Sequence, residues 1–247
     1  MEGARALYPD WPAPPSVHAF VTTRDGGFST GAYASLNLGD HVGDDPQVVA
    51  ANRERVRKSA ALPAEPHWLQ QVHGRVVVDL ATASLQPVAD GAVSFAPGAI
   101  CAILTADCLP VLLCDRAGQR VAAAHAGWRG LAAGVLAETV TSLNCPPAEL
   151  IAWLGPAIGP DAFEVGAEVR AAFLQKDSAG AACFRPNRAH HWLADIYELA
   201  RRELRLLGVK DIFGGGYCTY SERERFYSYR RDGVTGRMAA LIWIEPC

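Results

Sequence analysis

The sequence predicts an α+β fold with mixed or antiparallel sheets and a small number of helices. Strand-like segments are grouped together, most densely between His67 and His125, and they do not alternate regularly with helical patterns. The composition, 50% hydrophobic and 20% charged residues, is that of a globular protein. Because no repeat or long flexible linker interrupts the 247 residues, we expect one domain spanning residues 1–247.

The first half of the chain is expected to hold one strand, one helix and then a run of strands. Val17–Thr23 has the apolar, β-branched character of a strand. Asp45 and Pro46 form an N-cap and a first-turn proline for a helix running toward Ala61. The strands expected next are Trp68–Val72, Val76–Asp79, Ala99–Leu104, Val111–Asp115 and Val121–His125.

The second half is expected to be richer in helices. A glycine-rich turn at Gly127–Gly130 leads into a helix over Leu131–Leu143, whose apolar residues follow a helical spacing. Two further helices are expected over Ala167–Gln175 and Asp195–Leu207, and Gly208 ends the second of them. Two further strands are expected over Ile151–Leu154 and Met238–Ile244.

Charge and composition exclude several classes of protein. Lys and Arg number 23 against 26 Asp and Glu, a net charge of −3, so nucleic acid and anionic membranes are not expected partners. The longest uncharged stretch, Gly91–Ala106, is too short and too broken by glycine and proline to span a bilayer. The N-terminal segment does not resemble a signal peptide. A cytoplasmic protein whose seven cysteines are reduced thiols is therefore expected.

Two histidines and a cysteine stand at the ends of predicted strands. His73, Cys108 and His125 each lie beside a turn, where strand ends can meet at one rim of a sheet. Two imidazoles and a thiolate suit zinc, and three protein ligands leave a fourth position for water or substrate. Two other interpretations stay open: three unrelated residues, or a nucleophilic Cys108 activated by His125.

Polar residues near these positions are candidates for substrate contacts. Arg24 and Arg129 both follow strands, and Arg129 precedes the predicted helix, where a phosphate could bind. Asn37 and His41 lie in a loop and could contact a ligand, although such loops are usually plain turns. Asp107 is a candidate proton acceptor or partner of a metal ligand, or a simple turn carboxylate.

Three other motifs do not carry a function. Gly27–Gly31 matches the Gly-x-Ser-x-Gly pattern of serine hydrolases, but a turn-rich loop follows where a helix is required. Gly214–Gly216 lacks the Lys and Ser/Thr of a phosphate-binding loop and is interpreted as a flexible turn. The arginine-rich segment 223–237 also contains acidic residues, and it is interpreted as a solvated, salt-bridged pair of strands.

Nine segments, in order and over nearly the whole chain, resemble the YfiH family. This is the laccase-domain or multicopper polyphenol oxidase group, whose members are now described as purine nucleoside phosphorylases. The matching segments are 22–27, 35–39, 41–44, 71–74, 105–111, 125–130, 155–159, 163–166 and 229–233.

The resemblance implies a single α+β domain, in which a mixed β-sheet sandwich is flanked by helices, and a zinc ion held by His73, Cys108 and His125. It also implies phosphate-dependent cleavage of adenosine, inosine and methylthioadenosine, with adenosine deamination as a second reaction. Arg24 and Arg129 would then compensate charge during catalysis. The zinc deaminase signature, His-x-Glu followed by Pro-Cys-x-x-Cys, is absent, so deamination would use a different scaffold.

Other functions attached to the family remain alternatives. The chain has seven histidines and no His-x-His, so the copper cluster of a laccase cannot be built, although a single Cu²⁺ could bind in vitro. A Cys108-dependent amide hydrolase that edits peptidoglycan precursors is the main enzymatic alternative. A binding protein with a structural zinc is the non-enzymatic one. Oligomeric state is not determined by the sequence.

Overall fold

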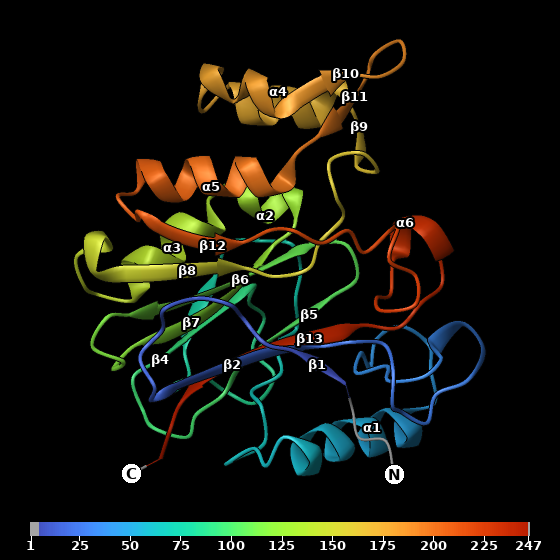
Figure 1. The fold of residues 1–247 in the computed structure, drawn as a ribbon, viewed down its shortest axis with the longest axis vertical. Coiled ribbons are helices and arrows are strands. Elements are labelled where there is room, and N and C mark those ends of the chain that lie inside the picture. The colour runs from blue at the N-terminus through green and yellow to red at the C-terminus, as the bar shows by residue number, and fades with distance from the viewer. Residues whose placement is uncertain (1–4, 247) are drawn as a thin grey trace.

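Two β-sheets lie face to face at the centre of the protein. The computed structural model describes residues 5–246. The smaller central sheet is antiparallel throughout, and Figure 1 shows it crossing the lower half of the molecule. Its strands, in spatial order, are β1 (Ala6–Leu7), β2 (Val17–Thr22), β13 (Met238–Ile244) and β5 (Cys101–Thr105).

The larger central sheet has six strands and is mixed. Its outer pairs, β12 with β8 and β3 with β4, are parallel, and its inner pairs are antiparallel. Its strands, in spatial order, are β12 (Asp211–Gly214), β8 (Leu150–Leu154), β6 (Leu109–Asp115), β7 (Val121–Ala126), β4 (Gly91–Ser94) and β3 (Val77–Asp79).

Helices cover the outer faces of both sheets. Figure 1 shows α1 below the smaller sheet, α2, α3 and α5 above the larger one, and a third sheet with α4 beyond them. The helices are α1 (Pro46–Ser59), α2 (Trp128–Ala133), α3 (Val135–Ser142), α4 (Ala167–Leu174), α5 (Ile196–Leu206) and α6 (Tyr229–Asp232). The third sheet contains β10 (Phe184–Pro186), β11 (His191–Ala194) and β9 (Glu164–Gly166). Short 3₁₀ helices cover Gly31–Tyr33, Pro147–Glu149 and Ser178–Cys183.

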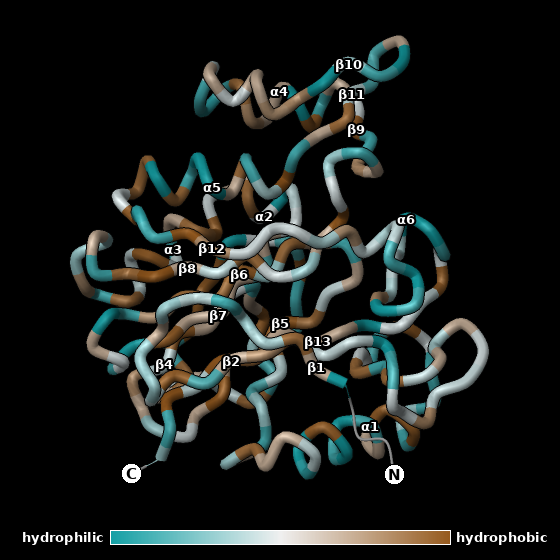
Figure 2. The backbone as a smooth tube through the Cα atoms, in the orientation of Figure 1, coloured by the Kyte–Doolittle hydropathy of each residue, from teal (hydrophilic) through white to brown (hydrophobic). Residues whose placement is uncertain are grey.

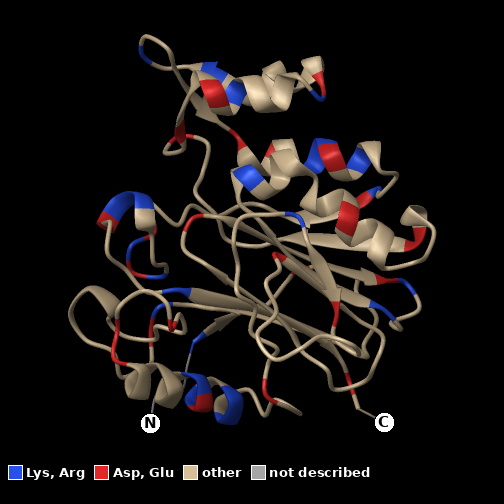
Figure 3. Cartoon of the chain, turned by 180° about the vertical axis from the view of Figure 1, so that it is seen from behind, with Lys and Arg blue, Asp and Glu red and all other residues tan. Residues whose placement is uncertain are grey.

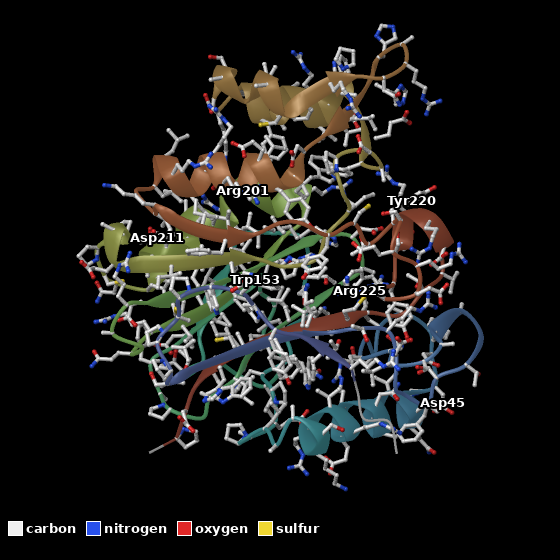
Figure 4. The ribbon with its side chains drawn as sticks, in the orientation of Figure 1. Asp45, Trp153, Arg201, Asp211, Tyr220 and Arg225 are labelled. Atoms are coloured by element: carbon white, nitrogen blue, oxygen red, sulfur yellow. The ribbon has the colours of Figure 1, made fainter. Side chains whose placement is uncertain are left out.

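Alternate residues of each central strand enter different hydrophobic layers. In β13, Ala240 and Ile242 face the space between the sheets, while Leu241 and Trp243 face α1. Trp153 of β8, labelled near the centre of Figure 4, also fills the space between the sheets. Because both faces are buried, the strands are apolar along their whole length, as the brown colour at the centre of Figure 2 shows.

Charged residues lie mainly outside these layers. Figure 3 shows most of them on the helices and connecting loops. Asp45, labelled in Figure 4, begins α1 by accepting a hydrogen bond from Gln47 N at 2.8 Å. This confirms the N-cap expected there. The α+β class with mixed sheets flanked by helices is confirmed as well.

The strand expected at Trp68–Val72 is wrong. This segment makes only two isolated bridges, at His67 and Gln70. The side chain of Gln71 explains the difference, because its amide accepts from Leu104 N and donates to Leu104 O. The Gln71 side chain therefore hydrogen-bonds the free N–H and C=O of Leu104 at the edge of β5. A neighbouring strand would otherwise bond these groups through its backbone.

Two predictions in the second half also need correction. The helix expected over Leu131–Leu143 begins at Trp128 and is divided into α2 and α3 by Gly134, which has φ +96°. A residue in the left-handed conformation ends a helix, and glycine adopts this conformation without steric cost. Arg129 consequently lies inside α2 and not before a helix.

The strand pair expected within 223–237 is a loop with the short helix α6. Ser228 caps this helix by accepting a hydrogen bond from Arg231 N. The guanidinium of Arg231 donates to the carbonyls of Thr219, Tyr220 and Phe226. These carbonyls are therefore bonded by a side chain instead of by the backbone of a paired strand.

The cysteines and the helices of residues 5–246 bear on two expectations, that the thiols are reduced and that the chain does not span a membrane. The six cysteines in this range are free thiols, and they form no disulfides with one another. In the same part of the chain, the helices are too short or too polar to cross a membrane.

Glu203 of α5 is expected to make stability depend on pH. Burial raises its pKa from 4.5 to about 7, against the opposing effects of Lys176 and the Ala137 N–H. The native state therefore holds an extra proton between these values, so the stability that Glu203 contributes is fully present below pH 4.5 and is lost as pH rises through 7.

Glu203→Gln, which removes this charge, should raise the free energy of unfolding by about 2 kcal/mol at pH 8 and hardly change it at pH 4.5. Urea denaturation at both pH values measures the difference. Glu198→Gln, on the same helix but ion-paired with Arg205 at the surface, is the matched control. Equal effects of Glu203→Gln at the two pH values would contradict this assignment.

Candidate metal centre

His73, Cys108 and His125 converge at one end of the six-stranded sheet. One ligand atom from each residue lies within 4.8 Å of the other two. The pairing of β6 with β7 sets Pro110 opposite His125, which brings Cys108, just before β6, to the end of β7. His73 comes from the loop before β3. Its ring packs edge-on against the His125 ring, with the two ring centres 4.8 Å apart. The sequence thus named three residues that the fold does bring together.

Gly127 makes this close approach possible. A Cβ atom at this position would lie 2.8 Å from the Cys108 sulfur and 3.3 Å from the His73 ring. Such distances are below normal van der Waals contact, so a larger residue would push the thiol and the imidazole apart. The glycine of the His-Ala-Gly-Trp segment is therefore required by packing at the site.

Asp90 holds two of the three ligands in place. Its side chain is fully buried, and its Oδ1 lies 2.8 Å from Nδ1 of His125. The same carboxylate accepts hydrogen bonds from the backbone N–H groups of Val72, His73 and Gly74 at 3.2, 2.9 and 2.6 Å. The bond to Nδ1 leaves Nε2 of His125 as the nitrogen available to a ligand.

The backbone is strained at two positions next to the sulfur. His73 has φ +60° and Asp107 has φ +92°, conformations that residues with a Cβ seldom adopt. The three hydrogen bonds to Asp90 compensate for the strain at His73. At Asp107 the carboxylate accepts from Thr219 Oγ1 and Arg230 N, both at 2.6 Å. Both left-handed turns aim their neighbours toward the same point.

The charges at the site favour a thiolate beside an imidazolium. Burial raises the pKa of Cys108, but the charges and hydrogen bonds of His125 and His73 outweigh it and bring the pKa to about 6. Burial lowers the pKa of His125, but Cys108 and Asp90 raise it to about 9. Burial acts to raise the pKa of Asp90, whose hydrogen bonds from His125 and the loop hold it below its usual value. Cys108 therefore already carries the negative charge that a cation requires, whereas metal binding at His125 would release the imidazolium proton.

The donor set fits a transition metal with one open side. Two donors on one tetrahedral zinc are roughly 3.4–3.6 Å apart, so a closure on the order of 1 Å would seat an ion. His125 is buried, Cys108 is half-buried and His73 is exposed. One side of the group is thus closed by protein and the other faces the surface, which is the arrangement of a reactive centre and not of a sealed structural one.

Two other residues singled out from the sequence are engaged in holding loops. The Arg24 guanidinium donates to the carbonyls of Ala34 and Arg223 and lies 4.8 Å from the centre of the Tyr227 ring. Asn37 is fully buried, and its amide bonds to Gly39 N and O, Asp44 and Arg237 N. All the hydrogen-bonding groups of the Asn37 amide are used inside the protein.

The remaining candidates lie at the surface. Arg129 is exposed, with its guanidinium 4.5 Å from the centre of the Trp128 ring. His41 is also exposed, and its pKa is lowered first by partial burial and then by the positive charge of Arg237. Arg237 was only part of a basic run in the sequence, yet its guanidinium interacts electrostatically with Cys108 and Asp107.

Two cavities border the region. One of about 330 Å³ is lined by His41, Gln71 and Val72, the residue directly before His73. A larger one, of about 840 Å³, lies beside Tyr220, labelled in Figure 4, and includes Arg230. Its lining contains none of the three converging ligands. The lining of the smaller cavity contains none of them either, so each cavity borders the site only through a neighbour: Val72 beside His73, or Arg230, whose N–H donates to Asp107.

Sequence reasoning missed Asp90 and Arg237. Asp90 is a single carboxylate within the apolar segment 87–95, and an isolated charge in a buried strand signals a specific partner. Arg237 directly precedes the apolar strand β13 and carries no such signal, because its neighbours come from distant segments.

Asp90→Asn should weaken metal binding roughly 10- to 100-fold, because an amide cannot accept from three backbone N–H groups and from His125 together. Competition with a chromophoric chelator for Zn²⁺ measures the affinity. Asp79→Asn, a turn-capping change in the neighbouring strand β3, is the control. Unchanged affinity in folded Asp90→Asn protein would refute the orienting role.

Comparison with known proteins identifies the family of this chain. A family model described as multi-copper polyphenol oxidoreductase laccase matches residues 18–245. The purine nucleoside phosphorylase YfiH of Escherichia coli is 53% identical over 242 residues, which are 98% of this chain and 99% of that protein. The purine nucleoside phosphorylase PA4543 of Pseudomonas aeruginosa is 55% identical over 240 residues, covering 97% and 98%.

Solved structures show the same fold. The crystal structure of the Neisseria meningitidis protein NMB0706 superposes with a TM-score of 0.94 at 52% identity, covering 98% of this chain and 99% of that one. YlmD of Geobacillus stearothermophilus gives a TM-score of 0.91 at 32% identity, covering 100% and 98%. The chain therefore belongs to the YfiH family, the group whose family model is described as a multi-copper polyphenol oxidoreductase laccase.

Proposed function

We propose that this protein is a zinc-dependent purine nucleoside phosphorylase. Its substrates would be adenosine, inosine and methylthioadenosine, cleaved by phosphate, and adenosine would also be deaminated. The observation that carries the proposal is the convergence of His73, Cys108 and His125 on one point with an exposed side. The naming of relatives that are 53% and 55% identical as purine nucleoside phosphorylases supports the reaction class.

The three ligands would hold a zinc ion, and Asp90 would fix the orientation of His125. When bound, the ion would act as a Lewis acid that orients or activates the reacting oxygen. In phosphorolysis a phosphate oxygen forms a bond to C1′ of the ribose as the bond to the base breaks. The base leaves with the bonding electrons and takes up a proton.

Neighbouring residues would bind the substrate. The cavity beside His41 and Val72 is of a size found for small-molecule sites and would receive the nucleoside. Arg129, exposed at the start of α2, would contribute positive charge. Arg24 and Asn37 would act indirectly by holding the loops, since their polar atoms bond to other parts of the chain. Asp107 would likewise position Cys108 through its bonds to Thr219 and Arg230.

A cysteine amide hydrolase is the second candidate, and one observation favours it. Asp90, His125 and Cys108 lie in the order of a carboxylate, an imidazole and a thiolate with a pKa of about 6. This is the arrangement of a nucleophilic triad, suited to amide bonds such as those of peptidoglycan precursors. His73 argues against it, because a triad does not need a second imidazole held close to the thiolate.

Copper chemistry is a lesser candidate. The same ligands could bind one Cu²⁺ in vitro, since copper binds nitrogen and sulfur donors more strongly than zinc does. Within residues 5–246, His73, Cys108 and His125 are the only such group of potential ligands, so the clustered copper ions of a laccase have no place there.

The reaction itself can be tested directly. Protein purified without added metal and then loaded with zinc should convert adenosine and phosphate to adenine and ribose 1-phosphate. Chromatography of both products, with and without phosphate, measures this. Inosine as an additional product would indicate deamination. A zinc-loaded protein that releases no adenine in the presence of phosphate would overturn the proposal.

His73→Ala separates the two candidate mechanisms. If His73 is a ligand, the variant should lose most of its zinc and its phosphorolysis, whereas a Cys108–His125–Asp90 hydrolase would keep its activity on amides. Metal analysis and both assays on the same preparation give the answer. His67→Ala, in the segment leading to the site but outside the ligand group, is the control.

A further inference from the structure

We propose that Arg237 binds the phosphate that the nucleoside phosphorylase reaction consumes. The inference rests on the proposed function and assigns its anion site to a residue that the sequence did not single out. It also transfers to Arg237 the role of direct phosphate contact that the sequence suggested for Arg24 and Arg129.

The register of the smaller sheet places Arg237 beside the cysteine turn. Met238 pairs with Thr105 in the β13–β5 ladder, so Arg237 and the Ala106–Cys108 turn leave the sheet at the same end. The backbone of Arg237 is fixed on both sides, because its N–H donates to Asn37 Oδ1 and its carbonyl accepts from Leu38 N. Buried Asn37 therefore acts by placing this arginine.

The side chain has a preformed path toward the site. A Cβ on Gly39 would lie 2.7 Å from Cγ of Arg237, so the glycine leaves room for the arginine stem. At the far end, Nη1 donates to the carbonyls of Thr235 and Gly236, each at 3.0 Å. Among residues 5–246, no group accepts a hydrogen bond from Nε or Nη2. One edge of the guanidinium is anchored, and the other is available to a ligand.

The electrostatic surroundings favour an anion next to this edge. Arg237 is half-buried, yet it forms no ion pair with a carboxylate of the described chain, unlike Arg53, which pairs with Asp40. The negative groups that interact with it electrostatically are Cys108 first and then Asp107. Asp107 already accepts two hydrogen bonds, and the charge of a metal-bound thiolate is neutralised by the ion. An oxyanion would then supply the countercharge that a half-buried guanidinium requires.

The other candidate arginines meet these conditions less well. Arg24 uses Nε, Nη1 and Nη2 on backbone carbonyls. Arg129 is exposed, where a charge is screened by solvent and salt. Arg24 is half-buried as well but has no unused donor nitrogen. Arg237 is half-buried, leaves the sheet at the same end as the Cys108 turn, and retains donors that could bind phosphate in the two-pronged manner typical of arginine.

Steady-state kinetics on zinc-loaded enzyme test the inference. Arg237→Gln should raise the KM for phosphate on the order of 10- to 100-fold while changing the KM for adenosine less than threefold. Arg237→Lys, which keeps the charge but not the planar fork, should fall between. Arg205→Gln on the surface of α5 is the control. Zinc content and the unfolding midpoint establish that each variant is folded and loaded.

Calorimetric titration with inorganic phosphate gives a readout that does not depend on turnover. Phosphate should bind wild-type protein and Arg205→Gln equally and Arg237→Gln on the order of 10-fold or more weakly. If wild-type protein binds phosphate through Arg237 but does not cleave nucleosides, the proposed function fails and the anion site stands. If folded Arg237→Gln keeps the phosphate affinity and KM of the wild type, the inference is wrong.

Discussion

The site depends on one buried carboxylate. Asp90 accepts hydrogen bonds from three consecutive backbone N–H groups, of Val72, His73 and Gly74, and from the ring of His125. A carboxylate removed from water is costly unless its oxygens are satisfied, and here four donors satisfy it. The same bonds hold His73 in a left-handed conformation and choose the nitrogen that His125 presents. Stability of the loop and orientation of two ligands thus have one physical cause.

The layered architecture explains why these ligands meet at the end of a sheet. Strands β6 and β7 are buried on both faces and have no freedom to slip, because a shift by one residue would move every apolar side chain into the wrong layer. Their pairing therefore holds Cys108 next to His125 rigidly. Chemistry is left to the turns beyond the strands, where Gly127 permits close approach and Asp107 tolerates a strained backbone.

The arginines around the centre have different duties. Arg24 and Arg231 donate to backbone carbonyls and replace regular secondary structure in the long loops. Arg237 is anchored through only one edge and interacts electrostatically with Cys108, an arrangement typical of anion recognition. The proximity of His73 to the thiolate favours the proposed metal centre over a nucleophilic triad, which would otherwise share Asp90, His125 and Cys108.

The sequence by itself determined the α+β class, the start of α1 and the bounds of β13, and the resemblance to a known family selected the three residues that converge at the candidate metal centre. Those features are local, since caps, apolar runs and short motifs act over a few residues. Only the tertiary structure decided the loop at Trp68–Val72, the break at Gly134, and the parts taken by Asp90 and Arg237. Each of these depends on partners far away in the chain, such as Gln71 with Leu104 or Arg237 with Cys108, and no local pattern encodes which distant groups will become neighbours.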